Sequence, residues 1–231
     1  MSLLEDSERG GLAKTAVPLT ILVLLLLVLA GVGGYLLRDS QLPGNDSVEV
    51  GFARDMSIHH EQAVEMSTLL YERTADPRMR TLAYDIMLTQ QGQIGIMSGW
   101  LDAWGQSWTA VGPRMAWMGM PMTGPMPGMA TAAEMQRLSE AEGEAADIIF
   151  LQLMIPHHVS GVAMAQAAAD GTDIAPVRQL AQGMADAQQG EIELMQELLV
   201  AKGMAPMDLD SMEMDMDMDA GMEMDGMSGD G

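Results

Sequence analysis

Two stretches of this 231-residue chain decide its fold because they repeat each other. Residues 52–66 read FARDMSIHHEQAVEM, and residues 150–164 read FLQLMIPHHVSGVAM. A Phe, a Met, a His-His pair, a Val and a second Met recur at a constant offset of 98 residues. The same offset relates residues 90–97, QQGQIGIM, to residues 188–195, QQGEIELM. The chain therefore contains an internal duplication, and each copy spans two consecutive segments of helical periodicity.

Each copy is predicted to be a helical hairpin, the first over residues 46–104 and the second over residues 131–203. Asp46 with Glu49 is a capping box that predicts the first helix start. Thr131 with Glu134 and Ser139 with Glu142 are further boxes, ahead of a long helix to about Ala169. Neither hairpin can bury its apolar face alone, so the sequence predicts an all-α, four-helix bundle.

An uncharged segment, Val17–Leu37, precedes the bundle and is long enough to cross a bilayer. Residues 17–38 are therefore expected to be a transmembrane anchor, with a cleaved signal segment as the alternative. Arg9 and Lys14 favour a cytoplasmic location for residues 1–16, so the domain would lie outside the cytoplasm, at the cell surface or in the periplasm. It would be secreted if the segment is cleaved.

The composition excludes several classes of function. Acidic residues outnumber basic ones by 33 to 11, a net charge of −22, which argues against nucleic acid as a partner. Cysteine is absent, so disulfides, zinc–thiolate sites and thiol catalysis are excluded. No phosphate loop, dinucleotide fingerprint or Ser–His–acid order is visible, and we expect no enzyme.

Methionine and histidine are the residues that point to chemistry. The chain has 26 Met, and its four His form two adjacent pairs. Met56 and His59 are spaced i, i+3, and Met66 follows His59 by seven residues, so the three share one helix face. Thioethers select soft ions, of which Cu(I) is the physiological one, and imidazole serves both copper oxidation states. A di-iron site is disfavoured because neither copy contains Glu-x-x-His.

Two further segments repeat the methionine theme. Residues 105–130 are rich in Gly, Pro and Met and are predicted to be a loop whose thioethers, among them Met118, Met120 and Met122, could converge on an ion. Residues 204–231 carry nine Met, nine acids and no base, so they are expected to be disordered without a ligand. The alternation around Met214, Met216 and Met218 combines soft sulfur with negative charge and predicts metal capture.

Residues 138–165, LSEAEGEAADIIFLQLMIPHHVSGVAMA, resemble the signature of a bacterial family called domain of unknown function 305. The resemblance covers roughly residues 48–203 and implies a ferritin-like bundle exported from the cytoplasm. For the copper-binding members it implies His and Met ligands, which by motif match are Met56, His59, His60, Met66 and Met97, together with Met154, His157, His158, Met164 and Met195. Ser57-Ile58 replaces the usual Ile-Pro, and Gln93 stands where the family often has Glu.

Two classes of function therefore remain. The first is an extracytoplasmic copper-binding protein that sequesters, buffers or delivers Cu(I), with a copper donor or acceptor protein as partner. The second is a non-metal helical scaffold or interaction module of the cell envelope, in which the His pairs are structural. A scaffold has no reason to hold fifteen Met in the loop and tail, and this favours the first class.

Overall fold

The computed structural model describes residues 21–34, 42–109 and 112–211. Within these ranges the secondary structure is helical, apart from one antiparallel bridge between Arg114 and Met122. The chain divides into two compact units, Met1–Leu42 and Pro43–Gly231. The predicted cytoplasmic segment, residues 1–16, lies outside the described residues.

The described part of the first unit is one apolar helix, Ile21–Gly34. Its Leu, Ile and Val side chains are exposed. This helix lies inside the predicted span Val17–Leu37 and is shorter than the roughly 20 residues that cross a bilayer. Residues 17–20 and 35–38, the remainder of the predicted anchor, lie outside the described residues.

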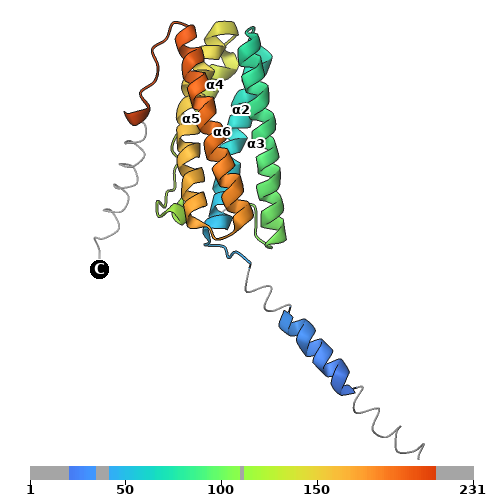
Figure 1. The fold of residues 1–231 in the computed structure, drawn as a ribbon. Coiled ribbons are helices and arrows are strands. Elements are labelled where there is room, and N and C mark those ends of the chain that lie inside the picture. Colours follow the sequence, from blue (N-terminus) through green and yellow to red (C-terminus); the bar gives the residue numbers. More distant parts are fainter. Residues whose placement is uncertain (1–20, 35–41, 110–111, 212–231) are drawn as a thin grey trace, which may run out of the picture. The chain divides into compact units, whose positions relative to one another are not determined.

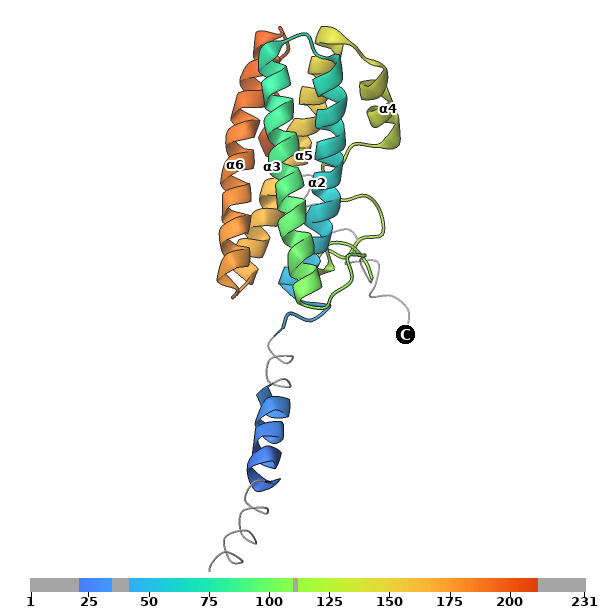
Figure 2. The same cartoon turned by 90° about the vertical axis from the view of Figure 1, so that its right-hand side faces the viewer.

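The second unit is a bundle of four long helices that pack side by side (Figures 1 and 2). These helices are α2 (Val48–Arg73), α3 (Pro77–Ala103), α5 (Gly143–Gly171) and α6 (Ala175–Ala201). Helices α2 and α3 form one hairpin, α5 and α6 form the other, and α2 packs on α5. A short helix, α4 (Ala132–Glu140), packs on α2 and α5. The structure thus confirms the predicted bundle of two hairpins.

The connection between the hairpins sets the direction of α5. The chain from Trp104 to Glu142, which includes α4, returns along the length of the bundle, so that α5 runs antiparallel to α2 (Figures 1 and 2). One long crossover of this kind is the connection found in ferritin-like bundles. The segment is not wholly irregular, because residues Ala116–Met118 form one 3-10 turn, η1. That turn packs against α2 and α5.

The duplication extends to the hairpin turns. Thr74 and Thr172, 98 residues apart, are both buried at the end of their first helix. The Arg80 guanidinium donates to the Thr74 carbonyl oxygen at 2.6 Å, and Arg178 donates to the Thr172 carbonyl oxygen in the same way. Both copies therefore use one device to fix the angle between their two helices.

The helix starts agree with the sequence at one capping box and differ at two. Thr131 and Glu134 form the predicted reciprocal box at the start of α4. At α2 the capping residue is Ser47, whose hydroxyl accepts from the Val50 N–H, so the assignment to Asp46 was wrong. Ser139 lies inside α4 and donates to the Gln136 carbonyl, so one predicted helix is two, α4 and α5.

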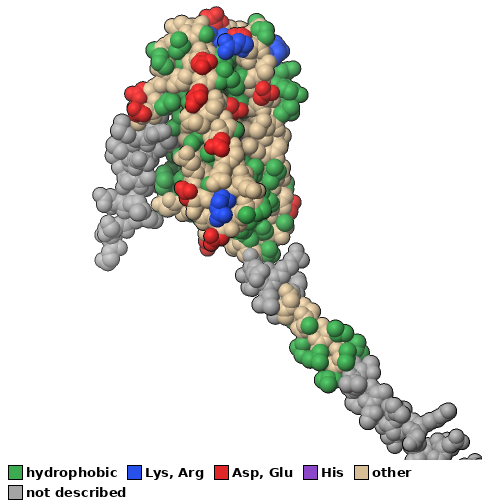
Figure 3. Space-filling model, in the orientation of Figure 1, with side chains coloured by type: hydrophobic (Ala, Val, Ile, Leu, Met, Phe, Trp, Pro, Cys, Tyr) green, Lys and Arg blue, Asp and Glu red, His purple; other side chains and the backbone are tan. Residues whose placement is uncertain are grey.

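Charged side chains on the bundle surface are mainly acidic on the face shown in Figure 3, and the basic ones are few. This distribution follows from the excess of 33 acids over 11 bases. No His is visible on this face, in keeping with the burial of all four. The polar chemistry of the His pairs is therefore confined to the interior.

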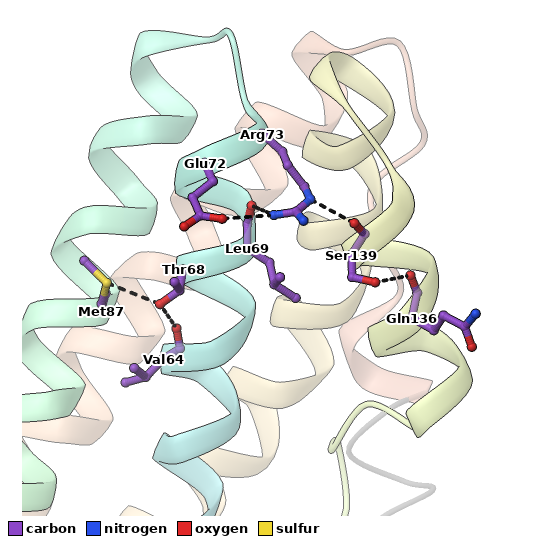
Figure 4. Close-up of polar contacts among 8 residues, drawn as sticks. All are labelled: Val64, Thr68, Leu69, Glu72, Arg73, Met87, Gln136 and Ser139. Atoms are coloured by element: carbon purple, nitrogen blue, oxygen red, sulfur yellow. Dashed lines mark hydrogen bonds and ion pairs between the residues drawn. The ribbon is translucent and has the colours of Figure 1, made fainter.

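One arginine ties α4 to the bundle. The Arg73 Nε donates to the Ser139 carbonyl oxygen at 2.9 Å, and its Nη1 donates to the Leu69 carbonyl oxygen at 3.1 Å (Figure 4). The bond to Ser139 satisfies a carbonyl group at the C-terminal end of α4, where no intrahelical N–H is available. Arg73 thus fixes the last turn of the crossover before α5 begins.

The chain keeps a fixed path past Gly203, where the sequence predicts the tail to begin. The Gln196 side-chain amide pairs with both backbone groups of Met207, donating to its carbonyl at 2.8 Å and accepting from its N–H at 2.9 Å. Met207 and Leu209 pack against the core. Lys202 also closes this end, donating to Asp76 at 3.0 Å and to Asp147 at 2.8 Å.

The crossover packs closely against α5 at Gly128, and a substitution there tests this contact. Its φ is +72°, and a Cβ there would collide with the Pro156 carbonyl and the Ser160 side chain. We expect Gly128→Ala to destabilise the bundle by about 1–3 kcal/mol through strain and overlap. Thermal unfolding followed by circular dichroism should show a melting temperature lower by about 2–4 °C per kcal/mol.

The control is Gly124→Ala, which lies in the same loop, has an ordinary φ and would place its Cβ in open space. Its melting temperature should match that of the parent chain. Equal melting temperatures for the Gly128 and Gly124 variants would show that the crossover does not press on α5.

Candidate metal centre

The two His pairs meet in the middle of the bundle, on the facing sides of α2 and α5. His59, His60, His157 and His158 are all 0% exposed. The rings of His59 and His157 stack, with centroids 3.7 Å apart and planes inclined by 32°. Because the two helices are antiparallel and carry the same motif, the four imidazoles form one layer with approximate two-fold symmetry.

Each second His is oriented by a residue of its own hairpin. His60 Nε2 lies 2.7 Å from Gln93 Oε1, and His158 Nε2 lies 2.7 Å from Glu191 Oε2. Both partners present an oxygen that accepts, so Nε2 is the donor and Nδ1 of the neutral ring keeps its lone pair. A hydrogen bond from one ring nitrogen is the usual way in which proteins orient an imidazole that binds metal through the other.

The remaining ring nitrogens are buried without partners. Six of the eight have none in the structure: both nitrogens of His59 and His157, and Nδ1 of His60 and His158. The side-chain amides of Gln90 and Gln188, also related by the 98-residue offset, are buried and unpaired too. An unsatisfied buried polar group costs about 1–3 kcal/mol. The layer is therefore an energetic liability to the bundle unless a ligand pairs with it.

Burial holds these imidazoles in the neutral form that binds metal. Desolvation lowers the pKa of His59 and of His157 well below 6.5, and nearby His rings lower both further. Desolvation lowers the pKa of His60 to about 3, although its bond to Gln93 acts in the opposite sense. Lone pairs on these three rings are thus free of protons at neutral pH.

The six Met of the duplicated motifs are all fully buried, and they form two groups. One core cluster contains Met56, Met97 and Met164, which we name the Met97 triad. The other contains Met66, Met154 and Met195, the Met195 triad. The 98-residue offset relates the two triads, because Met56 corresponds to Met154, Met97 to Met195 and Met66 to Met164. Each triad therefore takes two Met from one hairpin and one from its partner.

This arrangement corrects the predicted grouping of ligands. The sequence places Met56, His59 and Met66 on one face and suggests a single site per copy. At 1.5 Å of rise per residue, the ten residues between the two Met separate their Cα atoms by about 15 Å along the helix. Met56 and Met66 consequently belong to different triads, one on each side of the imidazole layer along the bundle axis.

The predicted loop ligands lie beside the core cluster that holds the Met97 triad. Met118, Met120 and Met122 are partly buried and pack against that cluster. Met115 and Met126, which the sequence analysis did not single out, are almost fully buried within it. The predicted tail ligands Met214, Met216 and Met218 lie outside the described residues.

A metal at the centre would need thioether ligands as well as imidazole. In the described ranges, no group of three or more His, Asp or Glu side chains is placed to hold an ion. The sequence analysis identified the His and Met of this region but missed the buried amides of Gln90 and Gln188. The repeated Gln-Gln-Gly was the signal available in the sequence. Within each pair only the first Gln is buried.

Comparison with known proteins matches residues 49–199 to the Domain of unknown function (DUF305). The chain belongs to the DUF305 family. A DUF305 protein from Streptomyces coelicolor that is presumed to be secreted is 46% identical, with a TM-score of 0.68 over 71% of this chain and 99% of that chain. A DUF305 fragment from Deinococcus radiodurans is 34% identical, with a TM-score of 0.57 over 69% and 98%.

CopM in its Cu(II)-bound form shares the fold of this DUF305 protein. It is 24% identical, with a TM-score of 0.53 over 67% of this chain and 97% of CopM. An uncharacterized protein of Acanthamoeba polyphaga mimivirus is 33% identical over 92 residues, which are 40% of this chain. The chain spans about half the length, 54%, of that relative.

The lowered imidazole pKa values predict an acid-sensitive bundle in the absence of metal. Between pH 6.5 and about 3 the histidines are protonated in the unfolded chain but not where they are buried in the folded bundle. The free energy of unfolding therefore falls as pH falls. Each ring contributes up to about 2 kcal/mol between pH 6.5 and 5. We expect the metal-free chain to melt at a lower temperature at pH 5.0 than at pH 7.5.

The control replaces both facing rings, His59→Leu with His157→Leu, and should reduce this dependence, leaving the contribution of His60. Asp55, whose pKa burial raises, acts in the opposite sense and stabilises the fold as pH falls, so it cannot produce the effect. A parent chain with the same melting temperature at both pH values would contradict the burial of neutral imidazoles.

Proposed function

We propose that this DUF305 protein is a copper-binding protein, anchored in a membrane with its bundle outside the cytoplasm, that sequesters, buffers or delivers Cu(I). It acts by holding the ion and not as an enzyme. The proposal rests on one observation above all: unprotonated, unpaired imidazole nitrogens are buried between two triads of thioethers. Copper is then the cargo of the protein.

The donor set decides which ion fits. Thioether sulfur and neutral imidazole favour Cu(I), whereas Mg²⁺, Ca²⁺ and Mn²⁺ need carboxylate or carbonyl oxygen. The carboxylate of Glu191 bonds to the ring of His158 at 2.7 Å, which increases the basicity of that imidazole toward a cation. The buried, unprotonated state of the other rings removes proton competition at neutral pH.

The duplication separates the proposed ligands from methionines that fill the core. Each Met of the two triads has a Met at its counterpart position. Met79 and Met184 are equally buried, but their counterparts are Val177 and Ile86. An aliphatic residue therefore serves at those positions, while the triad positions keep sulfur in both copies. This difference supports ligation by the triads over packing alone.

The comparisons support the proposal at two points. Solved structures of CopM carry Cu(II) and, in a co-crystallised form, Ag, in a bundle of this fold. The relative from Streptomyces coelicolor is presumed to be secreted, which agrees with an exported bundle. The apolar helix Ile21–Gly34 within Val17–Leu37 is the segment we propose as the anchor.

The loop and tail extend the same chemistry beyond the bundle. The loop supplies Met118, Met120 and Met122, and the tail supplies Met214, Met216 and Met218 among nine Met and nine acids. The acids attract cations over a range set by the Debye length, about 8 Å at physiological ionic strength, and the sulfurs form the bonds. Delivery of an ion requires a copper donor or acceptor protein as partner.

Substitutions at the centre test the proposal. The triple variant Met56→Leu, Met97→Leu, Met164→Leu keeps apolar volume but removes one triad of sulfurs. We expect its Cu(I) affinity to fall by at least about ten-fold, the smaller end of the effect of perturbing a metal site. Cu(II) affinity should change less because softness matters only for Cu(I). Competition with a chromogenic Cu(I) chelator measures the first quantity, and calorimetry measures the second.

The matched control is Met79→Leu with Met184→Leu, which removes buried thioethers from the same two clusters. Its Cu(I) affinity should equal that of the parent. The variant His59→Leu with His157→Leu should lose Cu(I) and Cu(II) affinity together. A parent chain that takes up no Cu(I), or equal affinities in all variants, would favour the scaffold alternative.

The tail can be tested separately by replacing its nine Met with Leu, which preserves charge and roughly preserves volume. We expect this chain to bind fewer Cu(I) ions than the parent while the affinity of the bundle for Cu(I) is unchanged. Replacing the nine tail acids with Asn or Gln should keep the stoichiometry but make uptake slower and less sensitive to salt. If the chain with the Met-to-Leu tail binds as many Cu(I) ions as the parent, the tail is only a solvated acidic segment.

A further inference from the structure

A pocket of about 280 Å³ between the crossover loop and α5 is lined by four methionines. Met115, Met118 and Met120 come from the loop, and Met164 comes from α5. Met118 and Met120 are partly exposed, whereas Met164 is fully buried. The other lining residues include Val159 and Ser160, which directly follow the second His pair. The pocket therefore lies between solvent and the imidazole layer.

Met164 belongs to this pocket and to the Met97 triad at once. Its partners in the triad, Met56 and Met97, have no exposed surface, and neither do the four His. An ion that reaches the imidazole layer must therefore pass through the core. Thioethers at Met118, Met120 and Met164 form a graded series from part exposure to full burial.

The loop uses thioether wherever it needs a large aliphatic side chain. Residues 112–130 contain six Met and no Leu, Ile, Val or Phe. Leu would fill the same volume with less conformational freedom, so packing alone does not favour Met at every such position. The loop composition therefore points to sulfur chemistry in addition to closure of the bundle.

A buried carboxylate, which is present in the first copy and absent from the second, holds one side of the pocket in place. Asp55 Oδ2 accepts from the Met115 backbone N–H at 2.8 Å and from the Trp117 ring N–H at 2.9 Å. Met115 has a left-handed backbone, φ +60°, which a non-glycine residue seldom adopts and which costs about 1–3 kcal/mol. The counterpart of Asp55 in the second copy is Leu153, so the second copy has no carboxylate at this position.

From these observations we infer that the loop pocket is the entry site through which a soft monovalent cation reaches the buried centre. The ion binds first to Met118 and Met120 and passes to Met164, which hands it to the Met97 triad. Asp55 is a positioning residue that keeps Met115, which lines the pocket, in place. This inference rests on the proposed function and adds the route and the order of loading.

The test compares rates of Cu(I) uptake with equilibrium affinities, in the full chain held in detergent. Met118→Leu with Met120→Leu removes the entry thioethers. Transfer from a chromogenic Cu(I) chelator, followed by stopped-flow absorbance, should slow by about ten-fold or more, while the equilibrium affinity of the central site stays within about two-fold of the parent. The matched control is Met129→Leu, in the same loop but outside the pocket.

Three results would overturn the inference. The entry variant could load as fast as the parent, or the entry and control variants could slow equally, which would assign the effect to loop packing. The entry variant could also lose central affinity in proportion to its rate, which would place Met118 and Met120 in the central site. Absence of Cu(I) uptake by the parent chain would overturn the proposed function and the entry role together.

A second measurement uses the parent chain and does not depend on the folding of variants. Methyl-labelled Met spectra are recorded while Ag(I), a soft ion without redox chemistry, is added. At low Ag(I) the methyl signals of Met118 and Met120 should shift before the methyl signals of Met56 and Met97 reach their final positions. Full shifts of the central methyls with no change at Met118 and Met120 would overturn the entry route.

Asp55→Asn tests the positioning role. Asparagine keeps a side-chain oxygen but lacks the negative charge of the carboxylate, which accepts from the Met115 backbone N–H and the Trp117 ring N–H. The rate of Cu(I) uptake should therefore fall, with no change in the Cu(I) affinity of the central site. Asp55→Glu, which restores the carboxylate, should recover part of the rate. A variant that changes only the melting temperature and not the uptake rate would show that Asp55 is structural.

Discussion

The burial of four imidazole rings at the contact between α2 and α5 is the constraint on which the bundle depends. The rings of His59 and His157, with centroids 3.7 Å apart, join the two hairpins at their centre, so the hairpins cannot be treated as independent parts. Burial also keeps His59, His60 and His157 neutral and leaves most of the ring nitrogens of the layer without partners. The bundle is therefore stabilised by its apolar clusters on either side of a layer that destabilises it.

The approximate two-fold symmetry explains why neither copy forms a site by itself. An antiparallel pair of identical motifs brings the start of one motif beside the end of the other. The Met97 triad and the Met195 triad each combine both hairpins for this reason. Binding of an ion by either triad would join the hairpins and raise the free energy of unfolding of the whole bundle, by mass action on the native state.

The sequence predicted the fold closely because the duplication and the helical periodicity agree, although only the Thr131–Glu134 capping box was confirmed. It also identified the buried His and Met, since these residue types recur in register. It could not predict which Met of the other hairpin would join Met56 and which would join Met66, because that grouping depends on the antiparallel packing of α2 on α5. It likewise could not predict the clamp of Asp55 on Met115, which joins residues 60 positions apart through a loop without periodicity.

The two halves of the centre differ in the residue that bonds to the second His, which is Gln93 in the first copy and Glu191 in the second. An otherwise symmetric pair of sites would fill together over a single narrow range of free metal concentration. A carboxylate behind one imidazole and a neutral amide behind the other give the two halves unequal affinities. Under the proposed function the protein would then load stepwise and hold free Cu(I) steady over a wider span of supply than two identical sites could.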